Sequence, residues 1–308
     1  MPAVCCTVAA IFLVEYTLYI WIKNQLMNTK TLYVTDLDGT LLSSDSVVSV
    51  RSVDIINELI ERGAMITVAT ARTPATVANL LADMCLSIPA IVMTGAATYN
   101  LVSGRYENVH FLDYEVVATS LRMFEDAGVN PFVYTLRDDQ ILHAFHASEM
   151  SNVEESFYVM RRDMKLKRFH IGENPKTADL ARTMLMFCVG EKDIFEPLAA
   201  RMSQAIGYPV TCYNDIFNDN KAFIEVFAPG VNKSQSVIRL ADSLGASRIV
   251  AFGDNLNDIS MMETADLGVA VENAYEEVKK CADIVIGSNN EDAVARWIYR
   301  DFTGDDWQ

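Results

Sequence analysis

Two aspartates separated by one residue lie just after an apolar segment near the start of the chain. The run is Asp36-Leu37-Asp38-Gly39-Thr40. The preceding segment Thr31–Thr35 is β-branched and apolar, as expected of a buried strand, and Gly39 allows the chain to turn sharply after it. Two neighbouring carboxylates repel each other unless a cation joins them, and Mg²⁺ prefers oxygen ligands. One carboxylate could then attack an electrophile while the other transfers protons. An acidic turn held by aspartate hydrogen bonds is the alternative interpretation.

Other polar residues occur where further strands end or a helix begins. Thr70 follows the apolar run 65–69, and Lys233 stands at the start of a helix predicted to continue to about Leu244. The predicted strand Arg248–Phe252 leads into the acidic run Gly253-Asp254-Asn255-Leu256-Asn257-Asp258. Open α/β sheets bind their ligands at the carboxyl ends of strands, so these features together and in this order indicate one site.

These segments resemble the motifs of the haloacid dehalogenase superfamily of phosphohydrolases. The closest likeness is to its Cof-type branch, which carries a large cap inserted in the second half of the core. The first to fourth motifs correspond to Asp36–Thr40, Thr70, Lys233 and Gly253–Asp258. The resemblance extends from about Thr31 to Trp297. Two positions depart from the family pattern: Ala71 replaces a glycine that is usual there, and Thr94 stands where asparagine is common before Gly95.

The resemblance implies an α/β fold with a Rossmann-like parallel-sheet core and an inserted α+β cap. It also implies a Mg²⁺-dependent phosphatase that hydrolyses a small phosphorylated metabolite, such as a sugar phosphate, through an aspartyl phosphate. Asp36 would be the nucleophile and Asp38 the general acid and base. The metal would be held by Asp36, by the backbone carbonyl of Asp38 and by Asp254, with Asp258 positioning the metal ligands. The expected phosphate and substrate contacts are Thr70, Lys233 and Asn257 for the phosphoryl oxygens and Arg72 for the substrate.

Two alternatives to a phosphatase stay open at this point. A phosphomutase or phosphotransferase of the same superfamily would share the aspartyl phosphate but pass the group to a hydroxyl acceptor. A non-catalytic protein that binds a phosphorylated metabolite is the other, although the chain keeps every polar group that turnover needs. A true dehalogenase is disfavoured because Asp38 and the acidic fourth motif belong to phosphate chemistry.

The expected domain organisation follows from where strands and helices alternate. Residues 31–111 and 221–308 are predicted to form the core, and residues 112–220 the inserted cap. Because the insert separates Thr70 from Lys233, we expect it to act as a lid that selects the substrate, with Arg137 and Asp138 as candidate contacts. His143 and His146 are interpreted as surface residues of the cap. Asn273, with Glu276 three residues on, predicts a capping box at a helix start.

Residues 1–30 form a hydrophobic extension outside the resemblance. Ala3–Ile22 is apolar enough and long enough to span a bilayer, and Lys23 and Lys30 would keep the catalytic part in the cytoplasm. A translation start placed too early, with Met27 as the true start, and an extra packed helix are the alternatives. A membrane is therefore a partner only if this segment is a real anchor.

Composition narrows the class of partner. The net charge of −16 argues against nucleic acid and anionic membrane surfaces, so an anionic substrate must be attracted locally, by a metal and Lys233. The six cysteines are scattered without a Cys-x-x-Cys pair, which indicates reduced residues of a cytoplasmic protein and no zinc site. The expected partner is a small phosphorylated metabolite, and no protein partner can be inferred.

Overall fold

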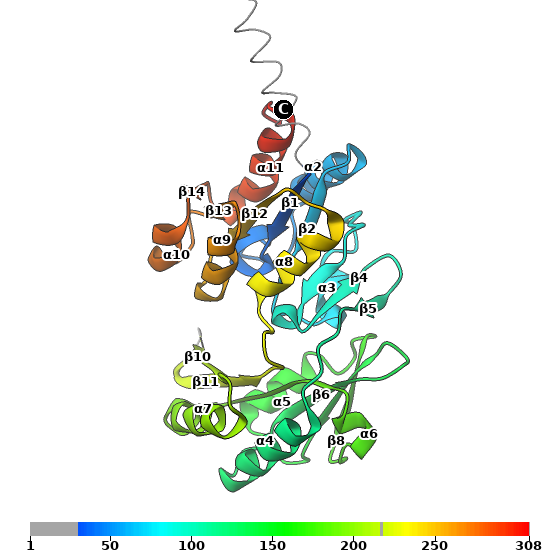
Figure 1. The fold of residues 1–308 in the computed structure, drawn as a ribbon, viewed down its shortest axis with the longest axis vertical. Helices are drawn as coiled ribbons and strands as arrows, with labels where there is room; N and C mark the ends of the chain where they lie inside the picture. The colour runs from blue at the N-terminus through cyan, green and yellow to red at the C-terminus, as the bar shows by residue number, and fades with distance from the viewer. Residues whose placement is uncertain (1–29, 216–217, 308) are drawn as a thin grey trace, which may run out of the picture. The chain divides into compact units, whose positions relative to one another are not determined.

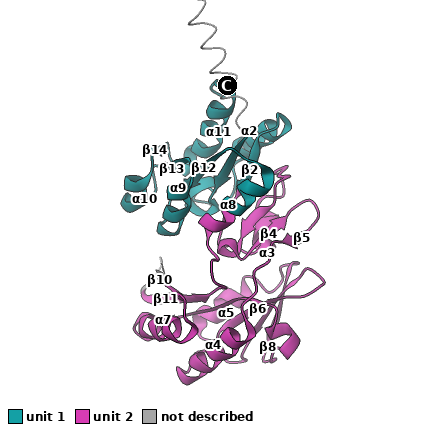
Figure 2. Ribbon diagram, viewed as in Figure 1, with its two compact units in different colours: residues 1–67, 238–308 teal, residues 68–237 magenta. Residues whose placement is uncertain are grey.

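The computed structural model describes residues 30–215 and 218–307, without the side chains of residues 214–219. The chain divides into two compact units, residues 1–67 with 238–308 and residues 68–237 (Figure 2). Within the described residues the strands, most of them labelled in Figure 1, are β1 Thr31–Thr35, β2 Met65–Val68, β3 Ala90–Val92, β4 Ala97–Asn100, β5 Arg105–Glu107, β6 Phe132–Leu136, β7 Leu142–His146, β8 Lys167–Ile171, β9 Thr183–Glu191, β10 Thr211–Asp215, β11 Asn218–Val226, β12 Arg248–Gly253, β13 Leu267–Ala270 and β14 Ile284–Val285.

The described helices alternate with the strands. They are α2 Val50–Glu61, α3 Pro74–Leu80, α4 Tyr114–Asp126, α5 Asn152–Val159, α6 Thr177–Leu180, α7 Lys192–Ile206, α8 Lys233–Leu244, α9 Ile259–Thr264, α10 Glu276–Cys281 and α11 Ala293–Thr303. Short turns of helical type occur at Leu37–Leu41, Met93–Gly95, Leu256–Asp258 and Asn289–Glu291. The predicted first strand and the predicted helix from Lys233 to Leu244 are confirmed.

The first unit is built on a five-stranded sheet in the order β14-β13-β12-β1-β2. β1 and β12 pair in parallel with Thr35 opposite Phe252, so both strands end at the same edge of the sheet. α9 packs against β12 and β13, and α2 packs against α11. Two parallel strands therefore deliver the residues that follow them, Asp36 and Asp254, to neighbouring positions.

The second unit carries two sheets. β3, β4 and β5 form a small antiparallel sheet, and six strands form a larger one in the order β10-β11-β9-β6-β7-β8. In the larger sheet only the pair β7–β8 is parallel. One face of this sheet packs on α4 and α7, where the buried Phe124, Phe195 and Leu198 meet Val133 and Met186. β11 crosses residue 220, where the end of the cap was predicted, and the domain boundaries stay a prediction.

Both histidines of β7 are buried, which corrects their assignment to the surface. His143 is fully buried and His146 is 3% exposed. β7 is an inner strand with neighbours on both sides, and all of its residues are buried. The His146 ring lies 4.2 Å from the Phe132 ring, while the His143 ring stacks on His170. The sequence pattern did not reveal that both faces of the sheet are covered here.

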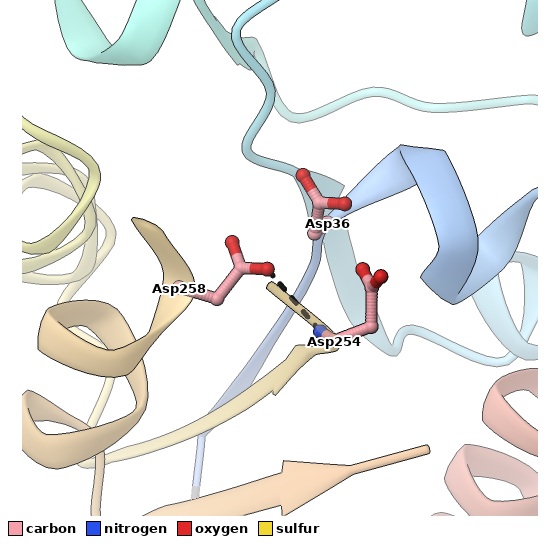
Figure 3. A group of neighbouring side chains, drawn as sticks. All are labelled: Asp36, Asp254 and Asp258. Atoms are coloured by element: carbon pink, nitrogen blue, oxygen red, sulfur yellow. Dashed lines mark hydrogen bonds between the residues drawn. The ribbon is translucent and has the colours of Figure 1, made fainter. Parts of the chain in front are cut away.

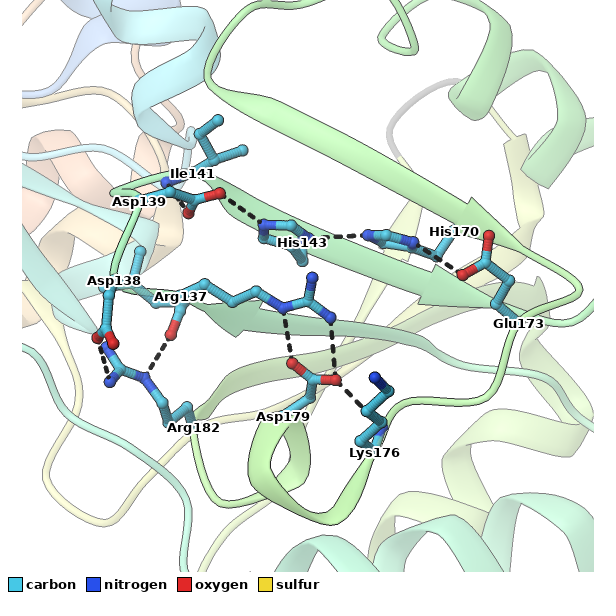
Figure 4. A network of polar contacts seen from close by, with 11 residues as sticks. Arg137, Asp138, Asp139, Ile141, His143, His170, Glu173, Lys176, Asp179 and Arg182 are labelled. Atoms are coloured by element: carbon cyan, nitrogen blue, oxygen red, sulfur yellow. Dashed lines mark hydrogen bonds and ion pairs between the residues drawn. The ribbon is translucent and has the colours of Figure 1, made fainter.

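Polar contacts between β6, β7, β8 and α6 hold one edge of the larger sheet (Figure 4). His143 Nδ1 lies 2.8 Å from His170 Nε2, and its Nε2 lies 3.2 Å from Asp139. Arg137 donates two hydrogen bonds to Asp179, at 2.7 and 3.0 Å. β8 and α6 were not predicted, because their few buried residues give no clear periodicity.

Arg137 and Asp138 are engaged within this edge of the sheet. Asp138 accepts a hydrogen bond of 2.8 Å from Arg182, so both candidate substrate contacts have partners inside the unit. These ion pairs do not test whether either residue contacts a substrate, and that role stays a prediction.

Within residues 30–215 and 218–307, no helix has both the length and the apolar character needed to cross a bilayer. Residues 3–22, for which an anchor, an early translation start and a packed helix were the alternatives, lie outside the described residues. The location of the protein therefore stays a prediction.

Replacing Asp179 with asparagine should destabilise the second unit more than the same change at Asp138. Hydrogen bonds from Arg137 hold the pKa of Asp179 below its usual value, and its side chain is only 9% exposed, against 94% for Asp138. We expect Asp179→Asn to lower the free energy of unfolding by about 1 to 3 kcal/mol and Asp138→Asn by less than about 1 kcal/mol.

The difference should depend on pH in one direction. Because the pKa of Asp179 is lowered by folding, its contribution is complete above the unfolded pKa of about 4 and is lost as pH falls through the folded value. Urea unfolding at pH 7 and pH 3 measures this. Equal losses for both variants at pH 7 would contradict the assignment.

Candidate active site

Three aspartates from two adjacent strand ends form a cluster in the first unit. One carboxylate oxygen from each of Asp36, Asp254 and Asp258 lies within 4.8 Å of the others (Figure 3). Asp36 follows β1, and its backbone N–H donates to the carbonyl of Phe252 in β12 at 3.0 Å. Asp36 and Asp258 are buried. Like charges at such distances in a desolvated place repel strongly, so the arrangement calls for a cation.

Backbone and hydroxyl donors orient two of these carboxylates. Asp258 accepts hydrogen bonds from the backbone N–H groups of Asp254 at 3.2 Å and Asn255 at 3.0 Å. Thr40 donates its hydroxyl to Asp254 at 2.7 Å. Asp258 therefore holds the loop that carries Asp254, and Thr40 fixes the Asp254 side chain. The sequence contained Thr40 within its first motif, but no role was assigned to it.

Two glycines allow the acidic residues to come this close. A Cβ added at Gly39 would lie 2.4 Å from Oδ2 of Asp254, and one at Gly253 would lie 2.5 Å from Cβ of Asp258. Gly39 also has φ +79°, a conformation that other residues adopt at a cost. The glycines of the first and fourth motifs thus supply the space for the cluster.

Asn273 joins the first motif to the loop after β13, which corrects the predicted capping box. Its side-chain amide donates to the carbonyl of Gly39 at 2.7 Å and accepts from the backbone of Asn289 at 3.0 Å. α10 begins only at Glu276, and its first turn has Tyr275 before it. Asn273 is therefore a positioning residue that local sequence could not reveal, because both of its partners are distant in the chain.

The cluster has the donor set of a hard divalent cation. All of its donors are carboxylate oxygens, with no histidine or cysteine in the group. Such sets suit Mg²⁺ and are unlike zinc sites, which use nitrogen and sulfur ligands. Asp38 and Asn257, from the same two motifs, are exposed to solvent.

The remaining predicted site residues belong to the second unit. Thr70 is buried, its backbone N–H donates to Ile91 at 3.0 Å, and its hydroxyl accepts from the backbone N–H of Arg72 at 3.1 Å. Lys233 is the first residue of α8 and is 1% exposed. That these residues and the acidic cluster bind the same substrate is part of the proposed function.

A close backbone approach fixes the start of α8. A Cβ at Gly95 would lie 2.6 Å from the carbonyl oxygen of Asn232, and Ser236 donates to the Gly95 carbonyl at 3.2 Å. The Asn232 side chain also accepts from the N–H of Gln235 at 2.8 Å, which caps the helix. Thr94, the departure from the family pattern, has φ +58°, a conformation for which asparagine is better suited.

The chain belongs to the haloacid dehalogenase-like hydrolases, whose family model matches residues 33–298. It is 26% identical over 270 residues to the 5-amino-6-(5-phospho-D-ribitylamino)uracil phosphatase YcsE of Bacillus subtilis, covering 87% of this chain and 94% of that protein. It is 23% identical over 275 residues to the pyridoxal phosphate phosphatase YbhA of Escherichia coli, covering 88% and 98%.

The fold agrees with a solved structure of the same family. The crystal structure of a haloacid dehalogenase-like hydrolase from Bacteroides thetaiotaomicron superposes with a TM-score of 0.71 at 23% identity, covering 88% of this chain and 98% of that one. The family resemblance, the fold class and the enzyme class, a phosphoric monoester hydrolase, are thereby confirmed.

Gly39→Ala should disable the site, whereas Gly63→Ala should not. Both glycines have positive φ, but the added Cβ would meet Asp254 at residue 39 and no heavy atom within 4 Å at residue 63. Each variant should lose about 1 to 2 kcal/mol of stability from backbone strain. Only Gly39→Ala should also lose about 100-fold in hydrolysis of p-nitrophenyl phosphate, because it displaces a carboxylate of the cluster. Equal activity losses in the two variants would show that strain alone is responsible.

Proposed function

We propose that this protein is a Mg²⁺-dependent phosphatase that hydrolyses a small phosphorylated metabolite through an aspartyl phosphate on Asp36. The observation that carries the proposal is the convergence of three carboxylate oxygens, from Asp36, Asp254 and Asp258, within 4.8 Å. Membership of the haloacid dehalogenase-like hydrolases over residues 33–298 supports it.

The chemistry requires one nucleophile and one group that moves protons. Asp36 attacks the phosphorus, so that a carboxylate oxygen–phosphorus bond forms as the bond to the leaving oxygen breaks. Asp38 donates a proton to that oxygen and then takes one from the water that hydrolyses the aspartyl phosphate, releasing phosphate. The exposure of Asp38 to solvent and the burial of Asp36 suit this division of roles.

The charge on the phosphoryl group must be balanced by the protein. Thr70, Lys233 and Asn257 bind its oxygens in this proposal, and Arg72 contacts the substrate. Mg²⁺, held by Asp36, the Asp38 carbonyl and Asp254 with Asp258 orienting the ligands, supplies positive charge that offsets repulsion between the nucleophile and the phosphate. The hydroxyl of Thr40 joins the first motif to Asp254, and the amide of Asn273 holds the backbone of the same motif at Gly39.

The substrate class is proposed from the relatives. YcsE and YbhA are named for small phosphorylated compounds, a ribityl-aminouracil phosphate and pyridoxal phosphate. The acidic cluster can bind only the phosphate of such a substrate, so other residues must recognise the rest of the molecule. We assign that recognition to the predicted cap, residues 112–220.

Asp36→Asn should abolish turnover without unfolding the protein, because an amide has nearly the same shape but is a poor nucleophile. Asp38→Asn should lower turnover by about 10²- to 10⁴-fold, the usual contribution of proton transfer. Release of inorganic phosphate from a panel of phosphomonoesters measures both, with Asp45→Asn, an exposed acid of the same unit, as the control. Phosphate release by Asp36→Asn at the wild-type rate would refute the covalent mechanism. Transfer to an acceptor hydroxyl without phosphate release would favour a phosphotransferase.

Removal of divalent metal should abolish activity, and Mg²⁺ should restore it. The all-carboxylate donor set of Asp36, Asp254 and Asp258 motivates this expectation. Mg²⁺ should also raise the melting temperature of the metal-free wild type but not of Asp254→Asn, since only the native site binds the ion. Asp45→Asn should respond as the wild type does. Full activity after exhaustive chelation, or much greater recovery with Zn²⁺, would contradict the assignment of the ion.

A further inference from the structure

The face of the larger sheet that does not pack on α4 and α7 carries a buried lysine among aromatic rings. Lys167, the first residue of β8, is 4% exposed, and its Nζ lies 3.1 Å from the hydroxyl oxygen of Tyr134 in β6. The ring centres of Tyr134, Phe157 and Phe169 lie 4.7 to 5.8 Å from Nζ. The rings attract the ammonium group but offer it no hydrogen-bond acceptor.

Lys167 has more hydrogen-bond donors than the acceptor that the described residues give it. Its ammonium group has three donors, and it donates to the hydroxyl oxygen of Tyr134. The carboxylate of Glu225 lies near enough to raise the pKa of Tyr134, but it forms no ion pair with Lys167 among the described residues. Among the residues that the structure describes, no carboxylate forms an ion pair with Lys167 or with the nearby Arg161. Buried donors and charges without acceptors are costly, so this place is suited to a ligand that supplies them.

Arg161 adds a second cation just beyond the end of α5. Its guanidinium lies 4.1 Å from the centre of the Phe157 ring, and it donates one hydrogen bond of 3.3 Å to the Phe157 carbonyl. The side chain is partly exposed, so most of its donors remain available. Burial and, to a smaller extent, the charge of Arg161 together lower the pKa of Lys167 to about 7. The two cations therefore disfavour each other until an anion joins them.

The cations lie near the segment that follows Thr70. Burial lowers the pKa of Arg161, and the charge of Arg72 contributes to the same shift. Thr76, in the first turn of α3, has its hydroxyl 3.9 Å from the sulfur of Met164, three residues after Arg161. All of these residues belong to the second unit. The segment that would bind the phosphoryl group thus lies beside the segment that carries Arg161.

We propose that Arg161 and Lys167, with Tyr134, form a second anion subsite, which binds a carboxylate or a second phosphate on the leaving group of the substrate. Arg161 makes the direct contact, and Lys167 supplies charge from the buried side. This inference rests on the proposed phosphatase function and narrows its substrate class to phosphomonoesters with a further acidic group.

Matched probes test the preference. 3-Phosphoglycerate and glycerol 3-phosphate differ by a carboxylate, and fructose 1,6-bisphosphate and fructose 6-phosphate differ by a phosphate. The wild type should favour the more acidic member of at least one pair by about tenfold or more in kcat/KM. Preference within the first pair alone identifies a carboxylate, and within the second alone a phosphate. Equal kcat/KM within both pairs would overturn the subsite.

Two variants and two neighbouring controls locate the preference. Arg161→Gln and Lys167→Met should each reduce it by about fivefold or more, mainly through KM. Arg162→Gln and Lys165→Met remove the same charges from exposed positions of the same segment and should keep it. An Arg161 that serves only to cap α5 would lower the melting temperature but leave the preference unchanged. Retention of the preference in both Arg161→Gln and Lys167→Met would reject the assignment.

Calorimetry separates this inference from the proposed function and does not depend on turnover. Asp36→Asn should bind 3-phosphoglycerate or fructose 1,6-bisphosphate about tenfold more tightly than the less acidic partner. An anion raises the pKa of Lys167 from about 7, and it also raises that of Glu225 near Tyr134, which burial has already brought to about 7. Binding at pH 7.5 should therefore take up protons, measured in buffers of different ionisation enthalpy. Lys167→Met in the Asp36→Asn background should reduce that uptake to the part that Glu225 contributes; if it does not fold, Arg161→Gln in that background should lose the affinity difference. Absence of hydrolysis of every probe would refute the phosphatase, whereas equal binding of both members refutes only the subsite.

Discussion

Mutual repulsion among Asp36, Asp254 and Asp258 is the constraint on which the first unit depends. Their carboxylate oxygens converge within 4.8 Å, so the fold must hold together groups that would separate in water. The parallel pairing of β1 with β12 brings these groups together, because it sets Thr35 opposite Phe252 and both strands then end at one edge of the sheet. A site held in this way favours a cation whether or not a substrate is bound, which is the condition for binding an anionic phosphate nearby.

The positioning of these acids relies on residues with no acidic chemistry of their own. Gly39 and Gly253 leave room for the carboxylates, Thr40 donates to Asp254, and Asn273 ties the first motif to the loop before α10. Except for the approach of Gly253 to Asp258 within one loop, each interaction joins segments far apart in the chain. A change at any of them moves a carboxylate without removing it, so the effect on activity should exceed the effect on stability.

The second unit carries polar groups of the opposite kind. Lys167 and Arg161 are cations without carboxylate partners among the described residues, in a protein whose net charge is −16. The overall negative charge repels anionic ligands, so only local groups can attract them. The hydrogen-bond network around His143 and Asp179 shows that elsewhere the same sheet does pair its charges. The two cations near Tyr134, without carboxylate ion pairs among the described residues, are therefore a distinct feature of this sheet.

The sequence by itself determined the catalytic motifs, the first strand, the helix from Lys233 to Leu244 and the family, because these depend on residue types within a few positions of one another. The tertiary structure decided what depends on distant pairing. His143 and His146 are buried because both faces of their sheet are covered. Asn273 binds Gly39 and Asn289 and does not cap a helix, and Lys167 lies beside Tyr134 of another strand. Local periodicity cannot encode such contacts, since a hydrogen bond across two strands is specified by their register and not by the sequence of either strand.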